Sequence, residues 1–234
     1  MGICAMKNTS STSSKKKSRY ILRLTKRSLS LCCVALVALL SLSFFCGRQA
    51  GINSTKYKEE ILLVNDEHRL SSDYVPEGLV NLYEQRHSFR LAASNIYLTR
   101  ECYEPMQRMF AAAEADNVNG FIVTSGYRDY QRQQEIYASS EEGKAQEAGA
   151  SEHQTGMAFD VTTETNDGFE STPQYAWLCA HAHEYGFIQR YPANKSDETG
   201  ISYEPWHYRY VGVEVATRIH NEDLTLEGFV KKYC

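Results

Sequence analysis

Residues 151–160 read SEHQTGMAFD, and residues 204–207 read EPWH. Together these segments supply the imidazoles of His153 and His207, the carboxylate of Asp160, and a further carboxylate on Glu204. A catalytic zinc ion takes about three protein ligands, keeps one position open for water, and works beside a carboxylate that accepts a proton from that water. The two segments therefore predict a zinc site with His153, Asp160 and His207 as ligands and Glu204 as the base.

The first segment also indicates a strand. Residues 158–163 are rich in β-branched side chains, and they follow Gly156, where the chain can turn sharply. Side chains alternate along a strand, so Asp160 lies on the opposite face from Phe159 and Val161. We therefore expect the Asp160 carboxylate to point away from a hydrophobic layer.

The second segment leads into another strand, because residues 206–211 (WHYRYV) alternate in the same way. His207 and Arg209 share one face of this strand, and the large apolar residues share the other. Pro205 lacks an amide donor and fits at the start or edge of a strand, so it separates Glu204 from the strand. We expect the Glu204 carboxylate to lie on a turn beside His207.

A His followed seven residues later by an Asp carries little weight alone, because most such pairs lie on the surface or in the core. The remaining histidines have no comparable company of ligands. We expect structural or solvent roles for all of them: His68, His87, His181, His183 and His220.

Four motifs in a fixed order resemble the VanY-type D-alanyl-D-alanine carboxypeptidases. They are SGYR at residues 125–128, Gln133, SEHQTGMAFD at residues 151–160, and EPWHYRYVG at residues 204–212. The family belongs to the zinc peptidases that also include lysostaphin-type enzymes and the hedgehog signalling domain. The resemblance covers about residues 62–215, and no ligand or base position departs from the family pattern.

The resemblance implies a zinc-dependent D,D-carboxypeptidase that removes the terminal D-alanine from peptidoglycan stem pentapeptides with metal-activated water. Zinc would be held by His153, Asp160 and His207, with Glu204 as general base. The resemblance also implies that Arg128 binds the substrate and steadies the developing oxyanion. The planar, permanently charged guanidinium of an arginine suits a terminal carboxylate. The other implied substrate-binding residues are Gln133 and Ser151.

Two other functions stay open. One is an L,D-carboxypeptidase that trims tetrapeptide stems, and the sequence does not choose between the D,D and L,D activities. The other is a non-catalytic, zinc-holding module that binds the cell wall, but such a module has no reason to retain the Glu204 base. The sequence also leaves open whether the role is antibiotic resistance or ordinary wall remodelling.

Residues 28–46 are almost wholly apolar and have about the ~20-residue length that a transmembrane helix needs. Seven Lys and Arg residues precede them, between positions 15 and 27. A basic flank stays in the cytoplasm, so we expect residues 1–27 to form a cytoplasmic tail and residues 28–46 to anchor the protein in the cell membrane. A cleaved signal peptide is the alternative, since Ser41 and Ser43 are small; we favour the anchor because the basic leader is long.

The remaining sequence fits one extracellular domain, residues 62–234, behind a polar linker at residues 47–61. The formal net charge is −4, and no basic stripe suggests binding to nucleic acid. We expect a monomer. An oxidising exterior allows a disulfide among Cys102, Cys179 and Cys234, but the sequence does not fix the pairing.

Strand and helix patterns alternate without a repeated βαβ unit, which favours an α+β fold with a small, mainly antiparallel sheet flanked by helices around a zinc cleft. Residues 139–151 are polar and rich in Gly and Ala, so we expect them to form a mobile rim of that cleft. The expected helices are one containing Met106, Met109, Phe110 and Ala113 after Pro105, then residues 129–145, residues 172–186, and an amphipathic helix from Val213. The expected strands are residues 121–124, 158–163, 187–191 and 208–211.

Overall fold

The structure is a computed structural model that describes Tyr57 and residues 61–140, 145–165 and 168–234. These residues belong to a unit that spans Gly51–Cys234. The expected tail and anchor, residues 1–46, lie outside the described residues. Within the described part of the chain, no helix combines the length and apolar character that crossing a bilayer requires.

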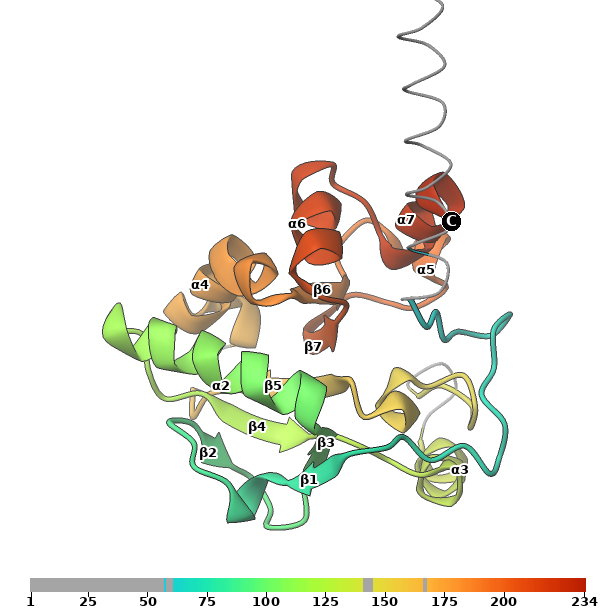
Figure 1. Ribbon diagram of the computed structural model, residues 1–234, viewed down its shortest axis with the longest axis horizontal. Helices are drawn as coiled ribbons and strands as arrows, with labels where there is room; N and C mark the ends of the chain where they lie inside the picture. Colours follow the sequence, from blue (N-terminus) through green and yellow to red (C-terminus); the bar gives the residue numbers. More distant parts are fainter. Residues whose placement is uncertain (1–56, 58–60, 141–144, 166–167) are drawn as a thin grey trace, which may run out of the picture. The chain divides into compact units, whose positions relative to one another are not determined.

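A five-stranded sheet forms the centre of this unit, in the order β2-β4-β5-β7-β6 (Figure 1). β2 and β4 are parallel, and every other neighbouring pair in this sheet is antiparallel. The strands are β2 (Arg90–Leu91), β4 (Ile122–Ser125), β5 (Ala158–Thr162), β7 (Glu204–Tyr210) and β6 (Phe187–Tyr191). A separate antiparallel pair joins β1 (Leu79–Asn81) to β3 (Tyr97–Thr99).

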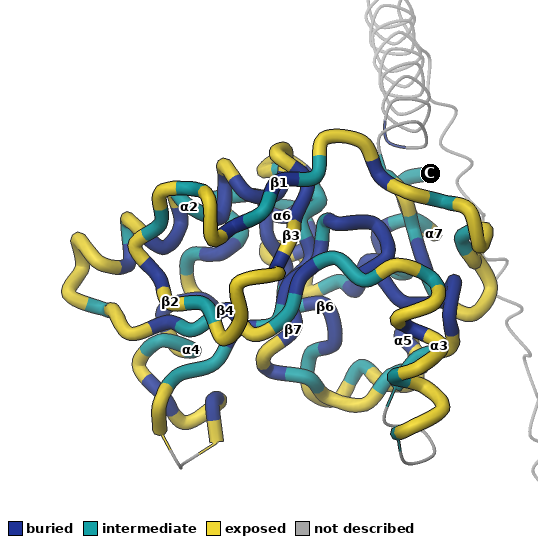
Figure 2. Tube along the Cα trace, turned by 90° about the horizontal axis from the view of Figure 1, so that it is seen from below, coloured by how far each residue is buried: buried dark blue, intermediate teal, exposed yellow. Residues whose placement is uncertain are grey.

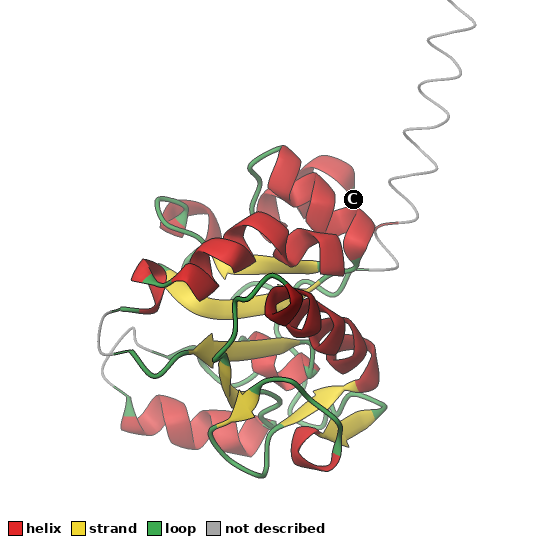
Figure 3. Cartoon of the chain, turned by 90° about the vertical axis from the view of Figure 1, so that its left-hand side faces the viewer, coloured by secondary structure: helices red, strands yellow, loops and turns green. Residues whose placement is uncertain are grey.

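Helices lie on both sides of the strands (Figure 3). The α-helices are α2 (Arg100–Ala115), α3 (Tyr130–Ser139), α4 (Pro173–His181), α5 (Ser196–Thr199), α6 (Val213–Asn221) and α7 (Leu226–Tyr233). Short 3-10 helices are η1 (Leu82–Glu84), η2 (Glu152–Thr155), η3 (Phe169–Ser171) and η4 (Ala182–Tyr185). The expected α+β fold with a mainly antiparallel sheet is confirmed.

The two faces of β5 meet different surroundings. Phe159 and Val161 are fully buried in the main hydrophobic core, together with Met106 and Phe110 of α2 and Leu178 of α4. α6 and α7 pack into a second cluster against Ile188 of β6. Much of β7 is buried as well, and its trace is dark blue there (Figure 2). The main core therefore covers the face of the sheet that does not carry Asp160, whereas Ile188, which pairs with Arg209 of β7, lies on the same face as Asp160 and His207.

Tyr57 is the one described residue of the expected linker before Ile61. Its ring is 1 % exposed and packs edge-on against Phe229 of α7, with ring centroids 5.3 Å apart. Residues 47–56 and 58–60 lie outside the described residues.

β7 differs from its expected form, because it begins at Glu204 and includes Pro205. Tyr208 pairs with Gln189, and Glu204 pairs with Tyr191. The chain therefore advances four residues along β7 over the stretch in which it advances two residues along β6. The register shift accommodates Pro205, which cannot donate a ladder hydrogen bond. The expectation that Glu204 lies on a turn outside the strand is wrong.

Three helix bounds also differ from the expectation. α2 begins at Arg100, five positions before Pro105, because Thr99 caps it by accepting a hydrogen bond from the Cys102 amide. α3 ends at Ser139 and not at Ala145. The carboxy-terminal segment forms two helices, α6 and α7, and the second begins where Thr225 accepts from the Gly228 amide.

Three cysteines lie in the described part of the chain, and no disulfide joins any two of them: Cys102, Cys179 and Cys234. Cys102 belongs to α2 and is buried in the main core, and burial raises the pKa of its thiol well above the usual value. The disulfide that the sequence allowed among these three residues does not form.

Candidate active site

His153 is held by a short turn and by one backbone carbonyl. It lies in η2 and is 2 % exposed. Gly156, with a φ of 66°, ends η2 and donates its amide to the His153 carbonyl. The Nδ1 atom of His153 lies 2.7 Å from the carbonyl oxygen of Gly126. Because a carbonyl only accepts, Nδ1 carries the hydrogen and Nε2 keeps its lone pair.

Asp160 and His207 are brought together by the sheet, since they are directly paired across β5 and β7. His207 Nδ1 lies 3.0 Å from Asp160 Oδ1, and His153 Nε2 lies 3.4 Å from Asp160 Oδ2. One ligand atom from each of the three residues lies within 4.8 Å of the others. Two imidazole nitrogens and one carboxylate form a donor set that fits a transition-metal ion such as zinc. The three residues can therefore hold a metal ion.

Glu204 stands next to this ligand set. Its Oε2 atom lies 3.9 Å from His207 Nδ1, farther than Asp160 does. Burial raises the pKa of the Glu204 carboxyl, with Asp160 adding to the effect and His207 and Arg128 opposing it. A carboxylate in this position can exchange a proton with a molecule bound at the ligands.

The ligands and Glu204 border a cavity of about 160 Å³. Arg128, Gln133 and Ser151 reach the same cavity from the segment before α3, from α3 itself and from the segment before η2. The other lining residues are Ile136, Ser140, Ala145, Gln146 and Trp206. The seven residues singled out from the sequence thus converge on one cavity.

Arg128 and Gln133 present polar atoms that lack partners. Arg128 Nε and Gln133 Oε1 are buried, and neither has a hydrogen-bond partner among the described residues. Gln133 is 1 % exposed, and its Nε2 donates to the Gln146 carbonyl at 2.7 Å. Burial lowers the pKa of the Arg128 guanidinium, although Asp160 and Glu204 oppose that shift. Buried polar groups of this kind are usually satisfied, so their arrangement suits a polar ligand in the cavity.

The two histidines differ in their electrostatic surroundings. Burial, helped by the charge of Arg128, lowers the pKa of His153 to about 4 against the opposing effect of Asp160. Burial also lowers the pKa of His207, but the nearby carboxylates of Asp160 and Glu152 outweigh it and raise the value to about 9. The difference arises because two carboxylates contact His207.

Glu152 is fully buried behind the site, and no role for it was predicted from the sequence. Arg190 of β6 and Arg209 of β7 lie against its carboxylate, and both are 2 % exposed or less. One signal was present, because strand alternation placed Arg209 on the same face as His207. A buried arginine there needs an acidic partner.

Comparisons with known proteins agree on the family. Residues 95–213 match the model of the VanY family, described as D-alanyl-D-alanine carboxypeptidase. YodJ of Bacillus subtilis (strain 168) is 39% identical over 196 residues, which is 78% of this chain and 71% of that protein.

Two solved structures are similar to this chain over most of their lengths. The LD-carboxypeptidase LdcB is 35% identical, with a TM-score of 0.65, over 74% of this chain and 86% of that one. The D,D-pentapeptidase VanY from the VanB-type vancomycin resistance cassette, in complex with Zn(II), is also 35% identical. Its TM-score is 0.59, over 73% of this chain and 98% of the other. Fold, motif order and matched length together place this chain in the VanY family of D-alanyl-D-alanine carboxypeptidases.

Proposed function

We propose that this protein is a zinc-dependent D,D-carboxypeptidase that removes the terminal D-alanine from peptidoglycan stem pentapeptides. The observation that carries the proposal is the convergence of His153, Asp160 and His207 with Glu204 and Arg128 on one cavity. The family match and the VanY structure with Zn(II) support the same metal and the same reaction class.

His153 Nε2, His207 Nδ1 and an Asp160 oxygen would hold the zinc ion. A zinc ion bound there would act as a Lewis acid and lower the pKa of a water molecule. Glu204 accepts the proton of the attacking water and then delivers it to the nitrogen of the departing D-alanine. Its carboxylate lies beside the ligand His207, close enough to the metal position to do both.

The remaining site residues bind and orient the peptide. Arg128 balances the negative charge that develops on the scissile carbonyl oxygen, in a buried setting where a fixed charge acts strongly. Gln133 and Ser151 contact the peptide backbone and its terminal carboxylate. The unpartnered Gln133 Oε1 is free to accept from a backbone amide.

An L,D-carboxypeptidase acting on tetrapeptide stems is the second candidate. The similarity to the LD-carboxypeptidase LdcB favours keeping it, because that match has a TM-score of 0.65. The two activities share the hydrolytic groups and differ in the residue that precedes the scissile bond. Substrate specificity therefore has to be measured on defined peptides.

We also propose that residues 28–46 anchor the enzyme in the cell membrane with residues 62–234 outside. The apolar character of this segment and its basic flank support this placement. There the domain would meet the stem peptides of the wall.

Products from defined muropeptides test the proposed activity. Full-length protein in detergent is incubated with pentapeptide and tetrapeptide stems in parallel, and the products are weighed by mass spectrometry. Loss of one alanine from the pentapeptide alone supports the D,D activity. Trimming of the tetrapeptide alone would replace it with the L,D activity.

Glu204→Ala separates catalysis from metal binding. We expect the variant to retain zinc while hydrolysis falls by about 10²–10⁴, as for loss of a general base. Glu184→Ala, on an exposed carboxylate that pairs with His181, is the control and should be fully active. Near-normal turnover by Glu204→Ala would refute its role as base, and loss of zinc would make Glu204 a ligand.

A further inference from the structure

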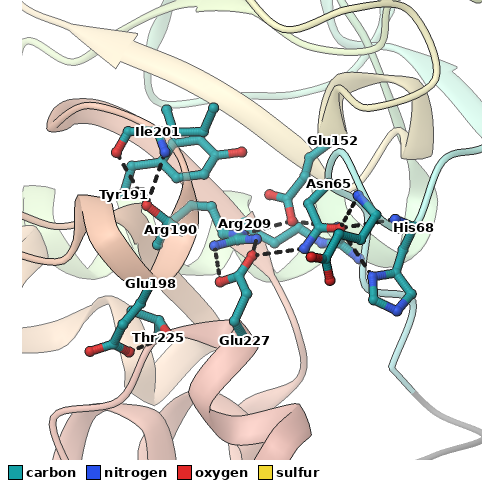
Figure 4. A network of polar contacts seen from close by, with 12 residues as sticks. Asn65, His68, Glu152, Arg190, Tyr191, Glu198, Ile201, Arg209, Thr225 and Glu227 are labelled. Atoms are coloured by element: carbon teal, nitrogen blue, oxygen red, sulfur yellow. Dashed lines mark hydrogen bonds and ion pairs between the residues drawn. The ribbon is translucent and has the colours of Figure 1, made fainter.

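A buried charge cluster lies directly behind the ligand His207. It consists of Glu152, Arg190, Arg209 and Glu227, with Arg190 lying between the two carboxylates (Figure 4). Glu152, Arg190 and Arg209 are 0 %, 1 % and 2 % exposed. Burying such charges is costly unless each is paired, so a cluster of this kind requires a specific arrangement of partners.

The arginines take up only one oxygen of Glu152. Arg190 Nε donates to Glu152 Oε1 at 2.8 Å, and Arg209 Nη1 lies 3.1 Å from the same oxygen. The other oxygen, Oε2, has no hydrogen-bond partner among the described residues. It faces His207 Nε2 at 3.6 Å, and that nitrogen is likewise buried and without a partner in the described part of the chain. Glu152 Oε2 and His207 Nε2 thus face each other without partners, and a small side-chain movement would bring them within hydrogen-bonding distance.

The orientation of the His207 ring determines which of its nitrogens can bind a metal and which faces Glu152. Nδ1 faces Asp160 at 3.0 Å and Glu204 at 3.9 Å, so it is the nitrogen that points to the metal ligands. A neutral imidazole that binds a metal through Nδ1 must carry its hydrogen on Nε2. That hydrogen points at Glu152 Oε2. Metal-binding histidines commonly donate their second nitrogen to a carboxylate, which fixes both the tautomer and the ring.

We propose that Glu152 is a positioning residue that accepts the Nε2 hydrogen of His207 and thereby holds Nδ1 toward the metal. Arg190 and Arg209 keep the Glu152 carboxylate in place by holding its other oxygen. The inference rests on the proposed zinc site, and it adds a residue for which the sequence analysis gave no role.

The cluster connects this ligand to a distant part of the chain. Arg190 Nη1 and Nη2 donate to the two oxygens of Glu227 in α7, at 2.8 and 2.5 Å. Asn65 Nδ2 donates to Glu227 Oε1 at 3.2 Å. The Tyr191 ring packs against His207 with centroids 5.1 Å apart. Glu227 holds the same arginine as Glu152 does, but among the described residues no hydrogen bond or ion pair joins it to His207, which makes it a matched control.

The test compares Glu152→Gln with Glu227→Gln in the full-length protein. Each change removes one carboxylate charge that pairs with Arg190, a fully buried one for Glu152 and a partly buried one for Glu227. We expect Glu152→Gln to weaken zinc binding by about 10–100-fold in chelator competition, because the ligand His207 loses the carboxylate that orients it. We expect Glu227→Gln to stay within about threefold of wild type, even if its melting temperature falls. Cobalt(II) absorption spectra should change for Glu152→Gln and match wild type for Glu227→Gln, because they report the geometry of the ligands.

Glu152→Asp keeps the test decisive if Glu152→Gln does not fold. It retains the charge that pairs with the arginines but shortens the reach toward His207, so zinc binding should weaken while the fold is kept. The inference would be overturned if whichever of Glu152→Gln and Glu152→Asp folds bound zinc with wild-type affinity. It would also be overturned if Glu227→Gln lost as much zinc affinity as the Glu152 variants. If the wild-type protein itself bound no zinc, the proposed function would fail instead, so the two failures are distinguishable.

Discussion

Gly126→Ala should weaken metal binding through a backbone clash that lies outside the ligand set. A Cβ atom at this position would lie 2.4 Å from the carbonyl oxygen of Tyr97 and 3.0 Å from Ile96 Cγ2. Ordinary contact begins at 3.4 Å, so the backbone must move by about 1 Å. The Tyr97 carbonyl also accepts from the Tyr127 amide at 2.7 Å, so it cannot retreat without loss.

The movement reaches the metal through one hydrogen bond. The Gly126 carbonyl accepts from His153 Nδ1 at 2.7 Å, and a shift of about 1 Å either breaks that bond or turns the ring. Overpacking should cost about 1–3 kcal/mol of folding stability. Loss of the hydrogen bond that orients the ligand His153 should weaken zinc binding by about 10–100-fold.

Chelator competition and urea unfolding of Gly126→Ala measure the two effects separately. Gly78→Ala is the control, because Gly78 has a φ of 70° and nothing lies within 4 Å of its Cβ position. It should lose about 1–2 kcal/mol from left-handed strain and keep its zinc affinity. Wild-type zinc binding by Gly126→Ala, or equal loss in Gly78→Ala, would refute the reasoning.

Three further changes test the fold. Phe159→Ala should cost about 3–5 kcal/mol in urea unfolding, because its buried ring contacts Phe110, Phe187 and Tyr208; a cost under about 1 kcal/mol would contradict this packing. Thr172→Ala should cost about 1 kcal/mol in the same assay, since Thr172 Oγ1 caps α4 by accepting from the Tyr175 amide. Burial and the neighbouring His220 lower the pKa of His183 in the folded protein. The unfolded protein therefore binds a proton at His183 more readily than the folded protein does. Stability should therefore fall as the pH drops below about 6.5, and melting curves of His183→Gln should show a smaller fall.

Much of the site could be anticipated because it depends on local rules. Strand alternation correctly placed Asp160 opposite Phe159, and it placed His207 with Arg209. The seven predicted residues do converge on one cavity, although their chemical roles stay predictions. Local pattern was sufficient here because side-chain direction in a strand follows from position alone.

The errors arise where distant residues decide the structure. The register shift that takes Glu204 and Pro205 into β7 depends on pairing with β6, which the local sequence does not reveal. Glu152 was missed because an isolated glutamate is normally exposed. Its burial depends on Arg190, 38 positions away, and on Arg209. No periodicity links those three positions.

The arrangement of the cavity has a consequence for how such an enzyme can diverge. Asp160, His207 and Glu204 lie on adjacent strands whose spacing is set by backbone pairing. Gln133 and Ala145 reach the cavity from α3 and from the segment that follows it, outside the central sheet. Mutations on that side can change which peptide is accepted without moving the hydrolytic groups. Related enzymes could thus acquire new substrate preferences by successive changes on one wall while each intermediate form remains an active hydrolase.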